Sequence, residues 1–318
     1  MNAEIQTMTT FRNCEKTLQN AIPCVGIGLH SGQKIHMTLK PAPIGTGVVF
    51  VRTDITDKDN RIPATYDHVV DTRMCSCIGN GAGVIVGTIE HLMGALNGME
   101  ITNVYVEVDG PEVPLMDGSA ADFVTLINCA GILTQDAPLK AVKILKTVSF
   151  DDGKGASVEL SPADEGLSLD FMIDFPQTKA IGRQEYSIEL TKGNFEDSIA
   201  YARTFGFTKD IEMLRSMGLA RGGSLENAIV VEGDHVVNAE GTRSENEFVV
   251  HKTLDAVGDL YQLGLPIIGH FSGTKSGHMH TNMLLRQLMS DKTAYEIVTL
   301  DNYTPSAYTS SNQARKIA

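Results

Sequence analysis

The segment HKTLDAVGD, residues 251–259, carries more information about fold and chemistry than any other part of this chain. Residues four apart lie above one another on the same face of an α-helix, so His251 and Asp255 would present an imidazole and a carboxylate to one point. This pair can bind a divalent metal ion, although an isolated His-x-x-x-Asp is more often a local hydrogen bond on a solvated helix. An apolar stripe with the helical period can face a core: Val250, Leu254, Val257 and Tyr261.

Strand and helix patterns around this segment are grouped and do not alternate strictly. The first half predicts a hairpin over residues 25–39 that turns at Ser31-Gly32, strands over 47–52 and 103–108, and a helix over 89–96. The second half predicts strands over 142–150, 156–161 and 167–175, a hairpin over 228–238, and helices over 195–202, 210–217, 246–263 and 278–289. We therefore expect an α+β fold and not a doubly wound sheet.

A chain of 318 residues is long enough for two domains, each with its own core. Residues 134–138, TQDAP, have the polar side chains and the proline that are typical of a linker. We place the boundary there and expect an N-terminal α+β domain over residues 1–137 and a C-terminal α+β domain over residues 138–318.

Composition limits the classes of function. A net charge of −13 argues against broad nucleic-acid binding, which depends on phosphate neutralisation. No apolar run approaches the roughly 20 residues that span a bilayer, and we find no secretory signal, so we expect a cytoplasmic protein that does not span the membrane. Five cysteines without a paired pattern suit a reducing compartment. Cys75 and Cys77 are separated by one residue and lack a second pair, so a structural zinc site is not expected there.

Glu90-His91, within TIEHL over residues 88–92, is a second candidate for the metal site. A carboxylate beside a metal ligand can act as acid or base on water near the metal. On its own the pair means little, because adjacent glutamate and histidine are common on exposed helices. Together with His251 and Asp255, His91 completes a set of two histidines and one carboxylate, which leaves a coordination position for water, as in catalytic sites.

His278 follows a glycine in KSGH, residues 275–278, at the expected start of a helix. A histidine in this position can serve as a general acid whose pKa is set by a carboxylate, and Asp259 is a candidate partner. Without the other motifs, an exposed surface histidine would be the preferred interpretation.

Six segments occur in the order in which one enzyme family carries them. They are GIGLHSG (26–32), TIEHLMGAL (88–96), PLMDGSA (114–120), ARTFGF (202–207), HKTLDAVGDL (251–260) and KSGH (275–278). Over roughly residues 18–300 the chain resembles the UDP-3-O-acyl-N-acetylglucosamine deacetylases, the zinc enzymes of bacterial lipid A synthesis. Chance agreement of six motifs in register is negligible.

The resemblance implies a zinc-dependent hydrolase that removes the N-acetyl group from UDP-3-O-(3-hydroxyacyl)-N-acetylglucosamine and releases acetate, the committed step of lipid A synthesis in Gram-negative bacteria. His91, His251 and Asp255 would hold the zinc, a donor set that also suits ferrous iron. Glu90 would be the general base that activates water. The implied fold is two tandem layered sheet-and-helix sandwiches, with the active site at their interface and a small βαβ insert at about residues 205–232 of the second.

The remaining roles also follow from the resemblance. His278 would be cationic, stabilise the oxyanion and protonate the departing amine, with Asp259 holding it in place. Thr204 would hydrogen-bond the tetrahedral intermediate. Lys252 would offer its ammonium group to the diphosphate or sugar, and the alternative for it is plain solvation. The acyl chain would lie in an apolar channel, whose residues can equally be ordinary packing of a small subdomain: Phe205, Ile211, Leu214, Ala220, Ala228 and Val230.

The expected partner is a UDP-linked acylated glucosamine, and we expect a monomer. Two other functions stay open. One is a zinc amidase that acts on a different acylated amine. The other is a catalytically silent protein that binds a nucleotide-sugar lipid, which predicts that a metal or base position is lost. The chain retains all of these positions: Glu90, His91, His251, Asp255 and His278.

Overall fold

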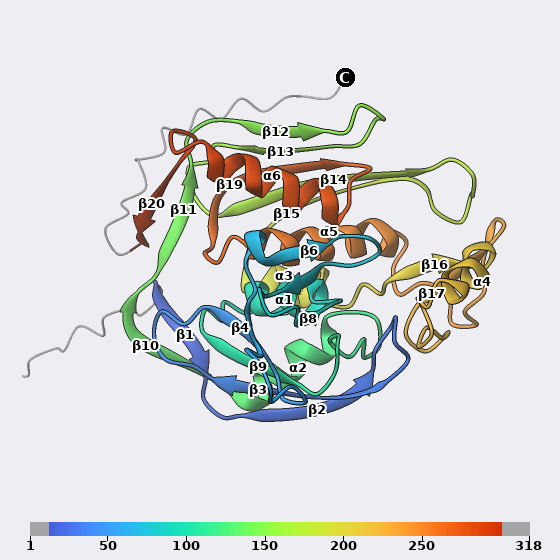
Figure 1. Ribbon diagram of the computed structural model, residues 1–318. Helices are drawn as coiled ribbons and strands as arrows, with labels where there is room; N and C mark the ends of the chain where they lie inside the picture. Colours follow the sequence, from blue (N-terminus) through green and yellow to red (C-terminus); the bar gives the residue numbers. More distant parts are fainter. Residues whose placement is uncertain (1–12, 301–318) are drawn as a thin grey trace, which may run out of the picture.

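The computed structural model describes residues 13–300 and confirms the α+β class (Figure 1). In Figure 1, helices α1 (Glu90–Gly98) and α5 (Glu247–Tyr261) lie in the middle, between a lower sheet of N-terminal strands and an upper sheet of C-terminal strands. Within residues 13–300, no helix is both long enough and apolar enough to cross a bilayer.

The lower sheet contains the hairpin that the sequence predicts. Its five strands have the order β2-β3-β9-β4-β5, and β2 and β3 pair antiparallel around a turn in which Gly32 has a φ of 68°. Side chains of β3 alternate between buried and more exposed, as expected for a strand with one face on a core. The strands are β2 (Ile22–Ile27), β3 (Lys34–Pro41), β4 (Val48–Arg52), β5 (Arg61–Pro63) and β9 (Val104–Val108).

Smaller elements connect this sheet to the central helices. Figure 1 places α2 (Ala121–Ala130) beside the lower sheet, and its contacts include α1 and β2. A three-stranded sheet in the order β6-β7-β8 leads into α1. These elements are η1 (Tyr66–His68), β6 (Val69–Asp71), β7 (Cys77–Gly79) and β8 (Ile85–Val86).

The upper sheet has seven strands and runs β12-β13-β19-β11-β20, with β14 and β15 also joined through β19. The single strand predicted over residues 142–150 is wrong, because the chain leaves β11 after Ile144 and pairs again only from Val148, with a different neighbour. The strands are β11 (Lys140–Ile144), β12 (Val148–Asp151), β13 (Ser157–Ser161), β14 (Leu167–Phe175), β15 (Gly182–Glu189), β19 (Ile267–Thr274) and β20 (Tyr295–Thr299). The C-terminal part of the chain also contains helices α3 (Lys192–Ser198) and α6 (His278–Ser290).

The predicted βαβ unit is present and projects from the side of the molecule (Figure 1). Strand β16 (Phe205–Phe207) pairs parallel with β17 (Ile229–Glu232), and α4 (Thr208–Ser216) lies between them in the chain. Strand β18 (His235–Val236) adds to β17 antiparallel.

The segment predicted as a linker is a strand. Residues 134–138 belong to β10 (Ile132–Pro138), which pairs antiparallel with β1 (Cys14–Leu18). Proline fits here because both strands of a two-stranded sheet are edges, where a missing N–H group need not break a ladder. The division into domains at residue 137 stays a prediction, and the ends of both predicted ranges lie outside the described residues.

Close contact between α1 and α5 depends on two glycines. A Cβ atom at Gly258 would lie 2.0 Å from the carbonyl oxygen of Glu90, and one at Gly94 would lie 2.8 Å from Cδ1 of Leu254. Real Cβ atoms essentially never come this close to another heavy atom. At Gly258 the obstacle is the backbone of α1, so glycine at this position allows the two helix backbones to approach this closely. This packing places the N-terminal end of α1 against the middle of α5.

Candidate active site

The packing of α1 on α5 brings His91, His251 and Asp255 together. The Nε2 atoms of both histidines lie 3.5 Å from Oδ1 of Asp255, and the three donor atoms are all within 4.8 Å of one another. All three side chains are buried, and the two imidazole rings meet edge to face at 5.0 Å. His251 and Asp255 share one helix face, as their spacing predicts.

The two oxygens of Asp255 have different surroundings. Oδ2 accepts a hydrogen bond of 2.6 Å from Nζ of Lys252, whereas the buried Oδ1 has no hydrogen-bond partner within residues 13–300. Burial opposes ionisation, but Lys252 and His251 outweigh it and hold the pKa of Asp255 well below its usual range. An ionised, unpartnered oxygen beside two imidazole nitrogens is the kind of donor set that a divalent cation binds, so these residues fit a metal.

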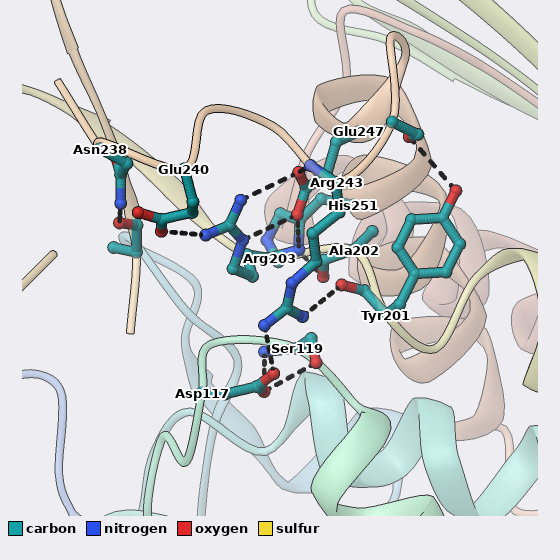
Figure 2. Close-up of polar contacts among 12 residues, drawn as sticks. Asp117, Ser119, Tyr201, Ala202, Arg203, Asn238, Glu240, Arg243, Glu247 and His251 are labelled. Atoms are coloured by element: carbon teal, nitrogen blue, oxygen red, sulfur yellow. Dashed lines mark hydrogen bonds and ion pairs between the residues drawn. The ribbon is translucent and has the colours of Figure 1, made fainter. Parts of the chain in front are cut away.

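The ring of His251 is held in one tautomer. Its Nδ1 lies 3.1 Å from the backbone oxygen of Ala202 (Figure 2), and a carbonyl can only accept, so Nδ1 carries the proton. Burial lowers the pKa of His251 to about 3, so the ring is neutral at physiological pH. The lone pair is therefore on Nε2, the atom that faces Asp255.

Glu90 begins α1 and its carboxylate is buried. Oε2 accepts a hydrogen bond of 3.0 Å from the backbone N–H of Ser76, and Oε1 lies 3.9 Å from Nε2 of His278. Burial raises the pKa of Glu90, and the neighbouring histidines oppose this rise only in part. A carboxylate in this environment is a stronger base than one in water.

His278 begins α6 and lies against Asp259 of α5. The distance from its Nδ1 to Oδ2 of Asp259 is 2.8 Å. Burial favours the neutral ring, but the carboxylates of Asp259 and Glu90 outweigh it and raise the pKa of His278 to about 9. His278 is therefore an imidazolium at neutral pH, as its expected role as an acid requires.

Ser76 contributes two contacts that the sequence did not predict. Its N–H donates to Glu90, and its hydroxyl donates to Oδ1 of Asp259 at 2.6 Å. One residue thus orients both the carboxylate expected to act as base and the carboxylate that holds His278. Its sequence context, CSC over residues 75–77, indicates no such role, since Ser76 meets Asp259 only in the folded chain.

A cavity of about 580 Å³ contains this cluster. Thr204 and Lys252 line it together with the three candidate metal ligands, Glu90 and His278, whereas Asp259 is not among its lining residues and contacts it through His278. The cavity continues into the βαβ unit, where it is lined by the residues expected to form the acyl channel: Phe205, Ile211, Leu214, Ala220, Ala228 and Val230. Lys252 is bound to Asp255, and its expected contact with substrate stays a prediction.

Three possible metal donors, a buried carboxylate and an imidazolium around one cavity are typical of metal-dependent hydrolases that cleave acyl groups. A model of the UDP-3-O-acyl N-acetylglycosamine deacetylase family matches residues 15–290, and the chain belongs to that family.

Curated relatives align over most of both chains. A UDP-3-O-acyl-N-acetylglucosamine deacetylase of Acidithiobacillus ferrooxidans is 51% identical over 286 residues, which cover 89% of this chain and 92% of the relative. Proteins with the same name from Hahella chejuensis and Pseudomonas entomophila are 49% and 48% identical to this chain. The first alignment covers 91% of this chain and 94% of the relative, and the second covers 89% of this chain and 93% of the relative.

Proposed function

We propose that this protein hydrolyses the acetamide of UDP-3-O-(3-hydroxyacyl)-N-acetylglucosamine and releases acetate, the committed step of lipid A synthesis. Membership of the family and the names of the relatives support the reaction. The observation that carries the proposal is the buried cluster of His91, His251 and Asp255, which opens on one cavity with Glu90 and His278. An amide is a poor electrophile with a poor leaving group, so its hydrolysis needs a Lewis acid, a base and an acid together.

In this proposal His91 and His251 hold one divalent ion through Nε2, and Asp255 holds it through Oδ1. Zinc is the ion we propose, and ferrous iron also suits these donors. When bound, the ion supplies Lewis acidity, which polarises the acetamide carbonyl and makes water a better nucleophile. Lys252 binds Oδ2 of Asp255, so Oδ1 is the oxygen that would hold the ion.

Glu90 and His278 carry the proton transfers. Glu90 accepts a proton from water as the water oxygen adds to the acetamide carbon. The C–N bond then breaks, and the departing nitrogen takes a proton from Nε2 of His278 to leave as an amine. Because Oε1 of Glu90 and Nε2 of His278 are 3.9 Å apart, both can reach one amide group.

Asp259 and Thr204 have supporting roles. Asp259 keeps His278 protonated and oriented through the contact at Nδ1, which leaves Nε2 directed toward the cavity. The backbone N–H of Thr204 donates to the carbonyl of Gly118 at 2.7 Å, which fixes the backbone at this position. We assign the Thr204 hydroxyl to the oxygen that gains negative charge when water adds.

The substrate extends from this centre in two directions. The acyl chain occupies the apolar part of the cavity in the βαβ unit, and we assign Lys252, which also lines the cavity, to the diphosphate or sugar. We further propose a monomeric, cytoplasmic enzyme, built from domains over residues 1–137 and 138–318 with the site at their interface.

The test is acetate release from UDP-3-O-(3-hydroxyacyl)-N-acetylglucosamine by the purified protein loaded with zinc. Activity should disappear on chelation and return with zinc. The variant Glu90→Gln should lose most turnover while it keeps its zinc, because an amide cannot accept the proton. The control Glu185→Gln changes an exposed carboxylate that pairs with exposed Arg183, and should keep full activity.

The same assay separates the alternatives. Release of acyl groups from other acylated amines, at rates equal to that of the UDP substrate, would support a broader amidase and contradict the proposal. Tight substrate binding without acetate release by zinc-loaded protein would indicate a silent binding protein.

A further inference from the structure

Residues 202–204, between α3 and β16, contact the proposed centre at two points. The carbonyl of Ala202 accepts the hydrogen bond from Nδ1 of His251, and Thr204 lines the cavity. Arg203 lies between them and is not among the residues that line the cavity; its buried side chain forms ion pairs with Glu247 and Glu240 (Figure 2). A shift of Arg203 would therefore move the backbone of both Ala202 and Thr204.

Arg203 is bound to Glu247 by backbone and side chain. Its N–H and Nε donate to Oε1 of Glu247 at 3.0 and 2.9 Å, and Nη2 donates to Oε2 at 3.2 Å. The outer edge of the guanidinium donates to Glu240 and to the carbonyl of Gly241, both at 2.9 Å. Arg203 is 3% exposed and Glu247 is fully buried, so this pair is deep in the protein.

Glu247 and His251 lie one helical turn apart on α5 and face the same segment (Figure 2). Glu247 binds residue 203, while His251 binds the carbonyl of residue 202. The two contacts attach consecutive residues of the segment to consecutive turns of the helix. The Ala202 carbonyl is therefore fixed in position relative to the His251 ring.

We propose that the Arg203–Glu247 pair is a positioning device for the metal ligand His251. It holds the Ala202 carbonyl where it accepts the Nδ1 proton, and so keeps the Nε2 lone pair directed toward Asp255. Hydrogen-bond partners of this kind fix the tautomer and orientation of ligating histidines, and their loss typically weakens metal binding about 10–100-fold. This inference rests on the proposed metal site.

A purely structural role is the alternative. A buried ion pair is often no more stabilising than apolar residues of the same volume, so stability alone is a weak reason for it. Arg52 provides a matched comparison. Its guanidinium is also largely buried, and it binds the carboxylate of Asp54 in a two-point contact and the carbonyl of Ile85, but it contacts none of the candidate metal ligands.

The test uses Arg203→Lys, Glu247→Gln and the control Arg52→Lys, with two readouts. The first is the tautomer of His251 in the metal-free protein, from the ¹⁵N shifts of the ring. The second is zinc affinity, from competition with a chelator. We expect Arg203→Lys and Glu247→Gln to lose the pure Nδ1–H tautomer and bind zinc about 10–100-fold more weakly. Arg52→Lys should lower the Tm and leave both readouts as in the wild type.

A lower Tm with an unchanged His251 tautomer and unchanged zinc affinity in the Arg203 and Glu247 variants would overturn the inference. If neither variant folds, Glu240→Gln can be used instead, because it weakens the ion pair at the exposed end of the Arg203 guanidinium. This variant should lower zinc affinity by a smaller factor. Unchanged affinity there would also overturn it. Neither readout measures acetate release, so a failure of the proposed reaction is distinguished from a failure of this inference.

Discussion

The variant Asp259→Asn tests how His278 is kept protonated. It removes the carboxylate 2.8 Å from Nδ1 and leaves an amide of the same shape. An opposite charge at this distance raises the pKa of a histidine by about 1–3 units, so the variant should lower the pKa of His278 from about 9 by that amount. Because the role proposed for His278 requires an imidazolium, the basic limb of kcat/KM should move to lower pH by the same interval.

Stability should change in the same pH window. In the wild type the folded pKa of about 9 exceeds the ordinary value of 6.5, so protonated His278 stabilises the folded state. This contribution, roughly 3 kcal/mol, is complete below pH 6.5 and is lost as pH rises through about 9. In Asp259→Asn it should be smaller and should disappear at lower pH.

The assays are a pH profile of acetate release, a pH series of urea unfolding and an NMR titration of the His278 ring in metal-free protein. Asp109→Asn is the matched control, since Asp109 contacts Nδ1 of His36 at 2.7 Å on the surface, and it should leave the kinetic profile unchanged. A basic limb near pH 9 in both the wild type and Asp259→Asn would refute the role given to Asp259.

Two further predictions concern helix packing and the channel. Gly258→Ala would place a Cβ atom 2.0 Å from the carbonyl of Glu90, so α1 and α5 must separate and the free energy of unfolding should fall by about 1–3 kcal/mol in urea titrations. An unchanged free energy would show that the helices do not need this contact. Ala228→Phe adds a ring to the wall of the cavity, so the ratio of kcat/KM for short over long acyl chains should rise. An unchanged ratio across acyl lengths would place the chain elsewhere.

Local periodicity predicted the part of the site that lies on single helices. His251 and Asp255 share a face of α5 because the helical repeat alone decides this. The close approach of α1 to this face is seen only in the structure, which places Leu254 and Gly258 of α5 against Gly94. The parallel pairing of β16 with β17 was expected from the family resemblance and was not visible in the strand pattern alone.

The structural features that the sequence patterns did not predict depend on contacts between distant parts of the chain. Pro138 and its polar neighbours gave no sign of a strand, but β10 pairs with β1, more than 100 residues earlier. Ser76 contacts Asp259 across 183 positions, and Arg203 contacts Glu247 across 44, so no local pattern marks either contact. The break after Ile144 likewise follows from a change of neighbouring strand.

We propose that acetate release requires one metal ion held by His91, His251 and Asp255. Titration of metal-free protein with zinc, with acetate release and bound metal measured at each point, tests this requirement most directly. We expect activity to rise in proportion to zinc and to reach its plateau at one ion per chain. We also expect Asp255→Ala neither to retain the ion nor to release acetate. Full acetate release by metal-free protein, or by Asp255→Ala, would show that this metal site is not required.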